Sequence, residues 1–168
     1  MTDNNESLRE LVLEYLRSGK VLHLASLSND TMWMCHVWYA VGGGPEEIIF
    51  TSNKSRRHSR DIRNNSVVAG GVVAIDLEEL GQKVRGLSFE GRAEETTGDA
   101  MERAYNLYAK RWPQVKKMFT AKQIRSDATD MRMYRVQLTR VVLFDEVNFP
   151  DNPRQELFLR VEGDSPSH

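Results

Sequence analysis

The stretch "EIIFTSNKSRRHSRDIRNNSVVAGGVVAI", Glu47 to Ile75, joins two apolar runs through a strongly basic segment. Its first residues, "EIIFTS", have the length and apolar character of a short strand. The basic part is predicted to be helical from Ser55 to about Asn64. The run "SVVAGGVVAI" is almost entirely apolar and β-branched, which predicts a strand buried on both faces. A strand, a basic helix and a buried strand therefore form the centre of the predicted fold.

The residues before this stretch predict a helix and a hairpin. An N-terminal helix is expected over residues 1–19, because apolar residues recur at helical spacing in "LRELVLEYL". The following "KVLHLASLSNDTMWMCHVWYAV" forms two extended runs around Asn29 and Asp30, which indicates a hairpin with a two-residue turn. Such a turn pairs positions whose numbers sum to 59, so His23 is expected opposite His36.

The residues after the stretch predict more strands than helices. "QKVRGLSFEGRAEET" indicates a strand, with Gly86 and Gly91 at bulges or barrel corners. A helical insertion over about residues 98–126 precedes the longest strand, "MRMYRVQLTRVVLFDEV", and a last strand, "QELFLRV". Because the hairpin is antiparallel and strands do not alternate with helices, we predict a closed or half-closed antiparallel barrel with helices outside. The barrel is expected over residues 20–162 of a single 168-residue domain, with a tail at 163–168.

Composition and charge limit the classes of partner. The formal net charge of −1 argues against broad binding to nucleic acid or a membrane surface, so anion binding should be local. One cysteine excludes an internal disulfide and a zinc site built from several cysteines. The first residues lack the basic and apolar parts of a signal peptide, and no apolar run approaches the roughly 18 residues of a membrane span. We therefore expect a cytoplasmic protein without a nucleic-acid or membrane partner.

The basic segment has two interpretations. Five of the 23 Lys and Arg residues fall within residues 54–63. A charge run of this kind is often a solvated helix face paired with acidic neighbours. A phosphate site, in contrast, needs Arg forks, hydroxyl groups and free N–H groups at a helix start, and the segment offers all three at a strand-to-helix junction. Ser55 is the candidate cap of that helix. The Walker and GxGxxG patterns are absent, so a P-loop or Rossmann cofactor is not expected.

Three motifs in order carry a resemblance to a known superfamily. "FTSNKSRR" follows an apolar strand and precedes a short helix and a buried strand; "VRGLSFEGRAEE" comes next, and "RMYRVQLTRVVLFDEV" ends in an acidic turn. This succession resembles the FMN-binding split barrel of the pyridoxamine 5'-phosphate oxidase-like superfamily, and "NFPDN" resembles a small, poorly characterised bacterial branch of it. The resemblance spans roughly residues 20–159. It implies a mainly β (α+β) fold: a six- to seven-stranded antiparallel split β-barrel with peripheral helices.

The resemblance also implies where the cofactor phosphate would bind. By position, Ser55, Arg56 and Arg57 would hold the phosphate of FMN. Lys54 and His58 are alternatives, because the register of the basic run can slip by one residue.

The rest of the flavin would contact other strands and a second subunit. Thr51 and Ser52 would line the ring or the ribityl chain, and His36 and Val37, at the end of the second strand, would offer backbone groups to the ring. Arg85 would reach the flavin from the other subunit, because the resemblance implies a homodimer with two flavins at its interface.

The function implied is that of an FMN-dependent oxidoreductase acting on an unknown small molecule, with a reduced nicotinamide as candidate hydride donor. The C-terminal substrate motif of the oxidases that make pyridoxal phosphate is not evident in "DNPRQELFLRVEGDSPSH". A non-catalytic flavin or haem carrier or sensor is the alternative, and a deazaflavin-dependent enzyme is a third. No catalytic residue is identified from the sequence, since no Ser-His-Asp order or paired-carboxylate pattern is present.

A few further side chains have two interpretations each. The His23–His36 pair is either a metal or haem-iron ligand set or a partly buried polar pair that contacts flavin, and no third metal ligand is evident. Cys35 is expected to be a packed hydrophobe rather than a nucleophile. Trp33 and Trp38 are expected to pack in the barrel or in a dimer interface, with stacking on the flavin as the alternative. Tyr105, Tyr108, Trp112 and Met118 lie in the helical insertion and are expected to pack, with a lid over a substrate pocket as the alternative.

Overall fold

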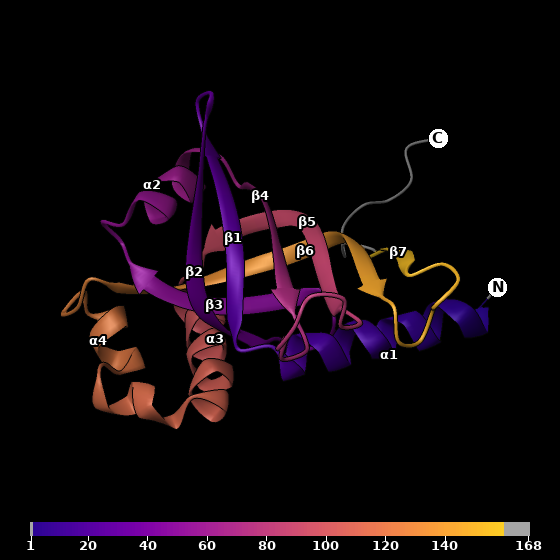
Figure 1. Ribbon diagram of the computed structural model, residues 1–168. Helices are drawn as coiled ribbons and strands as arrows, with labels where there is room; N and C mark the ends of the chain where they lie inside the picture. Colours follow the sequence, from indigo (N-terminus) through magenta and orange to yellow (C-terminus); the bar gives the residue numbers. More distant parts are fainter. Residues whose placement is uncertain (1, 160–168) are drawn as a thin grey trace.

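The computed structural model describes residues 2–159, which form an antiparallel barrel with helices around it (Figure 1). The strands are β1 (Val21–Ser28), β2 (Thr31–Val41), β3 (Glu47–Asn53), β4 (Val67–Val73), β5 (Arg85–Glu95), β6 (Met131–Asp145) and β7 (Arg154–Phe158). The helices are α1 (Thr2–Ser18), α2 (Arg57–Asn64), α3 (Gly98–Arg111), the 3-10 helix η1 (Pro113–Lys117) and α4 (Ala121–Arg125). The predicted tail, residues 163–168, lies outside the described residues.

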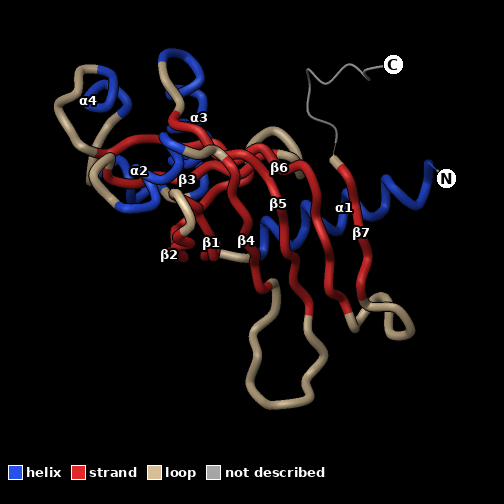
Figure 2. Tube along the Cα trace, turned by 90° about the horizontal axis from the view of Figure 1, so that it is seen from above, coloured by secondary structure: helices blue, strands red, loops and turns tan. Residues whose placement is uncertain are grey.

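The strands close into a barrel, as predicted. Their order is β3-β2-β1-β4-β5-β6-β7, and an additional pairing of β3 with β6 closes the first six strands into a ring. Every pairing is antiparallel, and β7 adds to the outer edge of β6. The tube view shows β7 at one side of the barrel and α2, α3 and α4 at the other (Figure 2). The fold is therefore a six-stranded split β-barrel with one outer strand and peripheral helices.

The register of the first hairpin is the one that the sequence predicts. His23 pairs with His36 and Leu24 with Cys35. The turn contains Asn29 with φ of 51°, a left-handed conformation that asparagine tolerates better than most residues. Because side chains alternate along a strand, this register places the two imidazoles on the outer face of the barrel and Leu24 inside it.

Two apolar clusters fix the helices on the barrel. The larger fills the barrel and includes the buried face of α1, with Val12, Tyr15 and Leu16. The second lies between the helical insertion and the outer surface of β3 and β6, where Ile49 and Met133 are fully buried. The insertion therefore stands beside one wall of the barrel rather than over its end. Among residues 2–159, no helix is both long enough and apolar enough to cross a lipid bilayer.

The prediction that β4 is buried on both faces is wrong for the single chain. Val68 and Val72 point into the core, whereas Val67 and Val73 are each 49% exposed. The reason is that a barrel strand has an inside and an outside, and no helix within residues 2–159 buries the outward-facing valines of β4.

Helix starts and one short helix also differ from the sequence prediction. Helix α2 begins at Arg57 after Arg56 as N-cap, and Ser55 does not cap it. Helix α4 was not predicted, because its five residues are too few for a periodic pattern. A register shift between Glu90 and Gly91 confirms the expected bulge, where a Cβ on Gly91 would lie 2.4 Å from the Gln137 carbonyl oxygen.

Candidate functional site

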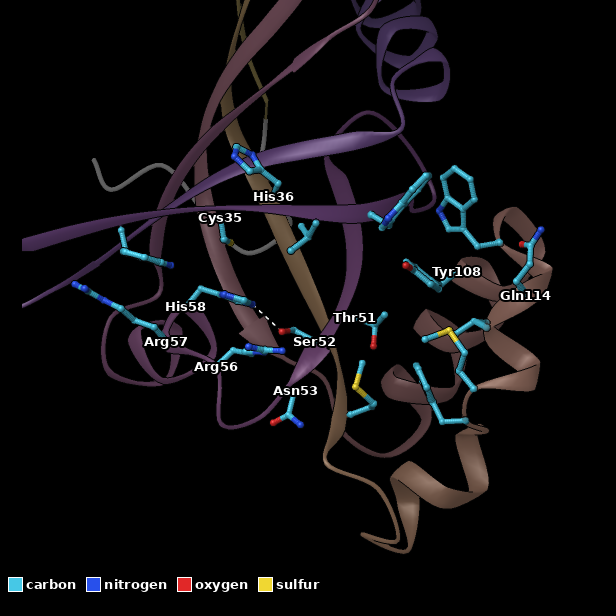
Figure 3. Close-up of a pocket in the computed structure, with 18 residues that line it drawn as sticks. Cys35, His36, Thr51, Ser52, Asn53, Arg56, Arg57, His58, Tyr108 and Gln114 are labelled. Carbon is cyan, nitrogen blue, oxygen red and sulfur yellow. Dashed lines mark hydrogen bonds between the residues drawn. The ribbon is translucent and has the colours of Figure 1, made fainter.

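A cavity of about 920 Å³ lies between the first barrel strands, helix α2 and the helical insertion (Figure 3). Its size is near the upper end of the roughly 300–1,000 Å³ typical of small-molecule sites. One end is polar and basic, with side chains from the β3–α2 junction: Thr51, Ser52, Asn53, Arg56, Arg57 and His58. The other end is a wall from α3 and η1: Tyr108, Trp112, Gln114, Val115, Met118 and Phe119. The cavity thus has one end suited to an anion and another suited to an apolar group.

The two adjacent arginines of the basic end have different environments. Arg57 lies with its Nε 3.6 Å from Asp61 and its guanidinium 4.9 Å from the ring centre of Trp33. Asp61 is itself buried and accepts a hydrogen bond of 3.0 Å from Ser26. Arg56, in contrast, lines the cavity and makes no side-chain hydrogen bond or ion pair with any other residue in 2–159. Arg56 is therefore the cation of this end that is ready to bind an anion.

A serine and a histidine form a fixed polar pair at the same end. The Ser52 hydroxyl and His58 Nε2 are 2.7 Å apart, and both residues are buried (Figure 3). Burial and the charge of Arg56 lower the pKa of His58, and Asp61 offsets part of this shift. The imidazole is therefore neutral at neutral pH, so it contributes a hydrogen bond rather than a charge. The nearby Thr51 hydroxyl donates to the Arg132 carbonyl at 3.0 Å, which leaves its oxygen as an acceptor.

Other members of the basic segment are engaged outside the cavity. The Lys54 ammonium lies 3.1 Å from Asp127 and 3.3 Å from Asp130, which raise its pKa. The Ser55 hydroxyl donates to the side chain of Asn53 at 2.7 Å. Lys54 is therefore a surface charge paired with acidic neighbours, which is the first of the two interpretations of the basic segment.

The two later arginines of the segment are also used locally. Arg60 donates to the Ser55 carbonyl at 2.6 Å, and Arg63 donates to the Lys54 carbonyl at 2.9 Å. Both are exposed and neither lines the cavity. These bonds tie the β3–α2 loop to the helix and so fix the backbone from which Arg56 projects.

His36 and Val37 both line the cavity, but they lie in the middle of β2 rather than at the end of the strand. The His36 ring is on the opposite side of β2 from His58 (Figure 3). It meets His23 edge-on, with ring centres 4.7 Å apart. Since the ring points away, the backbone of His36 is the part placed to contact a molecule inside the cavity. No cluster of three or more metal-binding side chains occurs among the described residues.

Arg85 is remote from this cavity. It lines a second cavity of about 620 Å³, together with Lys20, His23 and Val73. Its guanidinium lies 5.9 Å from the ring centre of Tyr15, and its Nε is buried without a hydrogen-bond partner within residues 2–159. Arg85 therefore cannot contact a molecule in the 920 Å³ cavity of its own chain.

The sequence analysis found only half of the helical wall. It named Tyr108, Trp112 and Met118 as packing or lid residues, but it assigned no role to Gln114 or Phe119. Trp112 is fixed by a 2.7 Å hydrogen bond from its indole N–H to the Tyr39 carbonyl. It also meets Trp38 edge-on, with ring centres 4.8 Å apart. The only sequence signal was Pro113, which was expected to start a second short helix and does so.

Cys35 also lines the cavity. Burial raises the pKa of its thiol to about 11, and the nearby charge of Asp61 raises it further. The thiol therefore stays protonated at neutral pH, in agreement with a packing role rather than a nucleophilic one.

Comparison with known proteins gives distant relatives. No protein-family model matches the chain. A UPF0306 protein of Yersinia pestis is 29% identical over 113 residues, which are 67% of this chain and 76% of that protein.

Solved structures share the fold at low sequence identity. A haem-binding protein from Mycobacterium smegmatis superposes with a TM-score of 0.73 at 18% identity, over 89% of this chain and 57% of that one, so this chain spans little more than half of its length. A NimC/NimA family protein from Clostridium acetobutylicum superposes with a TM-score of 0.66 at 12% identity, over 94% of this chain and 96% of that one. A putative pyridoxamine 5'-phosphate oxidase from Listeria innocua superposes with a TM-score of 0.61 at 14% sequence identity, over 81% of this chain and 97% of that one. The superfamily expected from the sequence thus fits these neighbours in fold.

Proposed function

We propose that the protein is a cytoplasmic FMN-binding flavoprotein that acts as an oxidoreductase on a small molecule. The observation that carries this proposal is the 920 Å³ cavity, with an unengaged arginine at one end and an aromatic wall at the other. A nucleotide cofactor such as FMN would place its dianionic phosphate at the basic end and its ring along β2, beside His36 and Val37, with the aromatic wall facing the ring. The shared fold with a putative pyridoxamine 5'-phosphate oxidase agrees with this proposal.

The residues present fit the group. Arg56 supplies a charge-assisted hydrogen bond to the phosphate, and Arg57 adds positive charge from a position fixed by Asp61 and Trp33. Ser52 and the neutral His58 supply further hydrogen-bonding groups at the same end. The backbone of His36 and Val37 faces the ring position along β2. A bound flavin supplies hydride transfer between a donor such as a reduced nicotinamide and an acceptor.

The cofactor assignment is tested by the absorption spectrum of the purified protein and by titration of the cofactor-free protein with FMN. We expect paired bands in the blue and near-ultraviolet, and mass spectrometry of the extracted cofactor separates FMN from a deazaflavin. A Soret band would favour the haem carrier, for which the similar M. smegmatis protein and the exposed His23–His36 pair are the supporting observations. A colourless protein that does not bind added FMN contradicts the proposal.

We further propose a homodimer in which Arg85 of one subunit approaches the flavin of the other. Arg85 is far from the cavity of its own chain, and its Nε has no hydrogen-bond partner among residues 2–159. A fixed cation near the ring stabilises negative charge that develops on reduction.

Arg85→Gln is therefore expected to lower the reduction potential of the bound flavin and to leave the affinity for FMN nearly unchanged. Redox titration of the variant beside the parent measures the first effect, and fluorescence titration of FMN measures the second. Arg92→Gln, on the same strand but outside both cavities, is the matched control. If Arg85→Gln still binds FMN and the reduction potential of the flavin is unchanged, Arg85 does not act on the flavin and has only a structural role beside Tyr15.

A further inference from the structure

The helical wall of the 920 Å³ cavity carries no charged side chain. Its lining residues are aromatic or apolar, apart from the amide of Gln114. Arg111 does not line the cavity: its guanidinium donates to the carbonyls of Leu16, Arg17 and Gly19 and lies 5.1 Å from the ring centre of Trp112. A molecule in this half of the cavity therefore meets no cation from the wall.

The other cations of the insertion do not line the cavity either, and Lys110, Lys117 and Lys122 are exposed. Arg103 makes two hydrogen bonds of 2.8 and 2.7 Å to Glu47, and Arg125 lies 2.9 Å from Glu102. Lys116 is exposed and does not line the cavity. Acidic or phosphorylated molecules would thus lose their hydration at the wall without gaining a charged partner, which costs several kcal/mol by the usual burial of an unpaired charge.

One hydroxyl that has no partner within residues 2–159 is available to a ligand in this half. Tyr108 is only 5% exposed, and its hydroxyl makes no hydrogen bond with any other residue in 2–159. Figure 3 shows the hydroxyl end of Tyr108 turned toward the interior of the cavity, on the side of Thr51. Burial raises the pKa of Tyr108 to about 12, so the hydroxyl is a proton-bearing donor at neutral pH. The hydroxyl is not one of the buried side-chain atoms that lack a partner within residues 2–159, so it is reachable from the cavity and free to donate to a bound molecule.

We infer that this half of the cavity binds an uncharged aromatic molecule that carries a hydrogen-bond acceptor, such as a carbonyl oxygen, and that Tyr108 donates to that acceptor. The inference rests on the proposed function, because the flavin phosphate neutralises the basic end and the ring occupies the space beside His36 and Val37. Trp112 and Phe119 line this half of the cavity and supply apolar surroundings for the second molecule. The site would therefore select a substrate by its lack of charge and by its hydrogen bond with Tyr108, and not by an ion pair with an arginine or lysine.

Three naphthalenes of similar size test the inference on FMN-loaded protein by isothermal titration calorimetry. They are 2-acetylnaphthalene, which is neutral with an acceptor; 2-naphthoate, which is anionic; and 2-ethylnaphthalene, which has no acceptor. We expect 2-acetylnaphthalene to bind at least tenfold more tightly than 2-naphthoate. Tyr108→Phe should weaken 2-acetylnaphthalene roughly two- to tenfold, the usual range for one neutral hydrogen bond, and leave 2-ethylnaphthalene unchanged.

A second variant is expected to gain affinity for the anionic probe rather than to lose affinity for the neutral one. Gln114 is exposed at the rim, so Gln114→Lys is expected to fold normally and to tighten 2-naphthoate several-fold. Equal affinities of the parent for the neutral and anionic probes, or an equal effect of Tyr108→Phe on all three, overturn the inference. FMN occupancy is measured separately, so a protein that binds no FMN contradicts the proposed function, whereas a loaded protein without the preference contradicts only this inference.

Discussion

Arg56→Ala is expected to weaken FMN binding by roughly 10- to 100-fold and to affect riboflavin, which lacks the phosphate, much less. A hydrogen bond to a charged group contributes about 1.5–3 kcal/mol, and 1.4 kcal/mol corresponds to a tenfold change in affinity. Arg56 is the arginine of this end that has no partner within residues 2–159, so its charge is fully available to the ligand. Quenching of flavin fluorescence on titration gives both dissociation constants.

The neighbouring arginines supply the comparison. Arg57→Ala is expected to reduce the affinity for FMN less than Arg56→Ala does, because the charge of Arg57 is shared with Asp61. The double variant should lose a hundredfold or more in FMN affinity. Arg60→Ala removes one positive charge from the same helix but outside the cavity, and it should leave FMN binding nearly unchanged. If FMN and riboflavin lose affinity equally in Arg56→Ala, the phosphate is not the group that Arg56 binds.

The strand pattern and the hairpin register could be predicted because they follow from local sequence. A two-residue turn and a strict alternation of side chains fix which residues face each other, and His23 does lie opposite His36. The basic segment was recognised for the same reason: its hydroxyls and arginines are adjacent in the chain.

What could not be predicted depends on contacts between distant segments. Lys54 is removed from the site by Asp127 and Asp130, which are more than seventy positions away and come close only when β3 pairs with β6. In the same way, Arg57 is distinguished from Arg56 by Asp61 and Trp33, and the latter belongs to another strand. The pairing of Arg57 with Asp61 has helical i,i+4 spacing and could be read from the segment, whereas Asp127, Asp130 and Trp33 could not. The prediction of a doubly buried β4 failed for a related reason, since apolar composition does not say whether the covering surface belongs to the same chain.

The outer face of β2, β1 and β4 leads to the second large expectation, an obligate dimer. This face carries Met34 and Trp38, which are 60% and 52% exposed, next to the half-exposed valines of β4. These exposed apolar side chains lie on the same face as the exposed His23–His36 pair, and exposed apolar surface of this kind often marks an interface. A second copy of the chain is the proposed occupant, because Arg85 at the edge of this face has access to a flavin only across such an interface. Light scattering at micromolar concentration should give about twice the 19.3 kDa of the chain.

Ala25→Glu is expected to convert this dimer to a monomer and to abolish FMN binding at micromolar protein. Ala25 lies at the centre of the face, paired with Met34 on one side and Ala69 on the other, so two symmetry-related carboxylates would be buried without partners. Its side chain points outward in the monomer, and circular dichroism should show the barrel intact. Phe158→Glu is the matched control, because Phe158 is an exposed apolar residue of β7, on the opposite side of the barrel (Figures 1 and 2). A parent protein that is a stable monomer and still binds FMN contradicts the shared site, and so does an Ala25→Glu monomer that retains full FMN affinity.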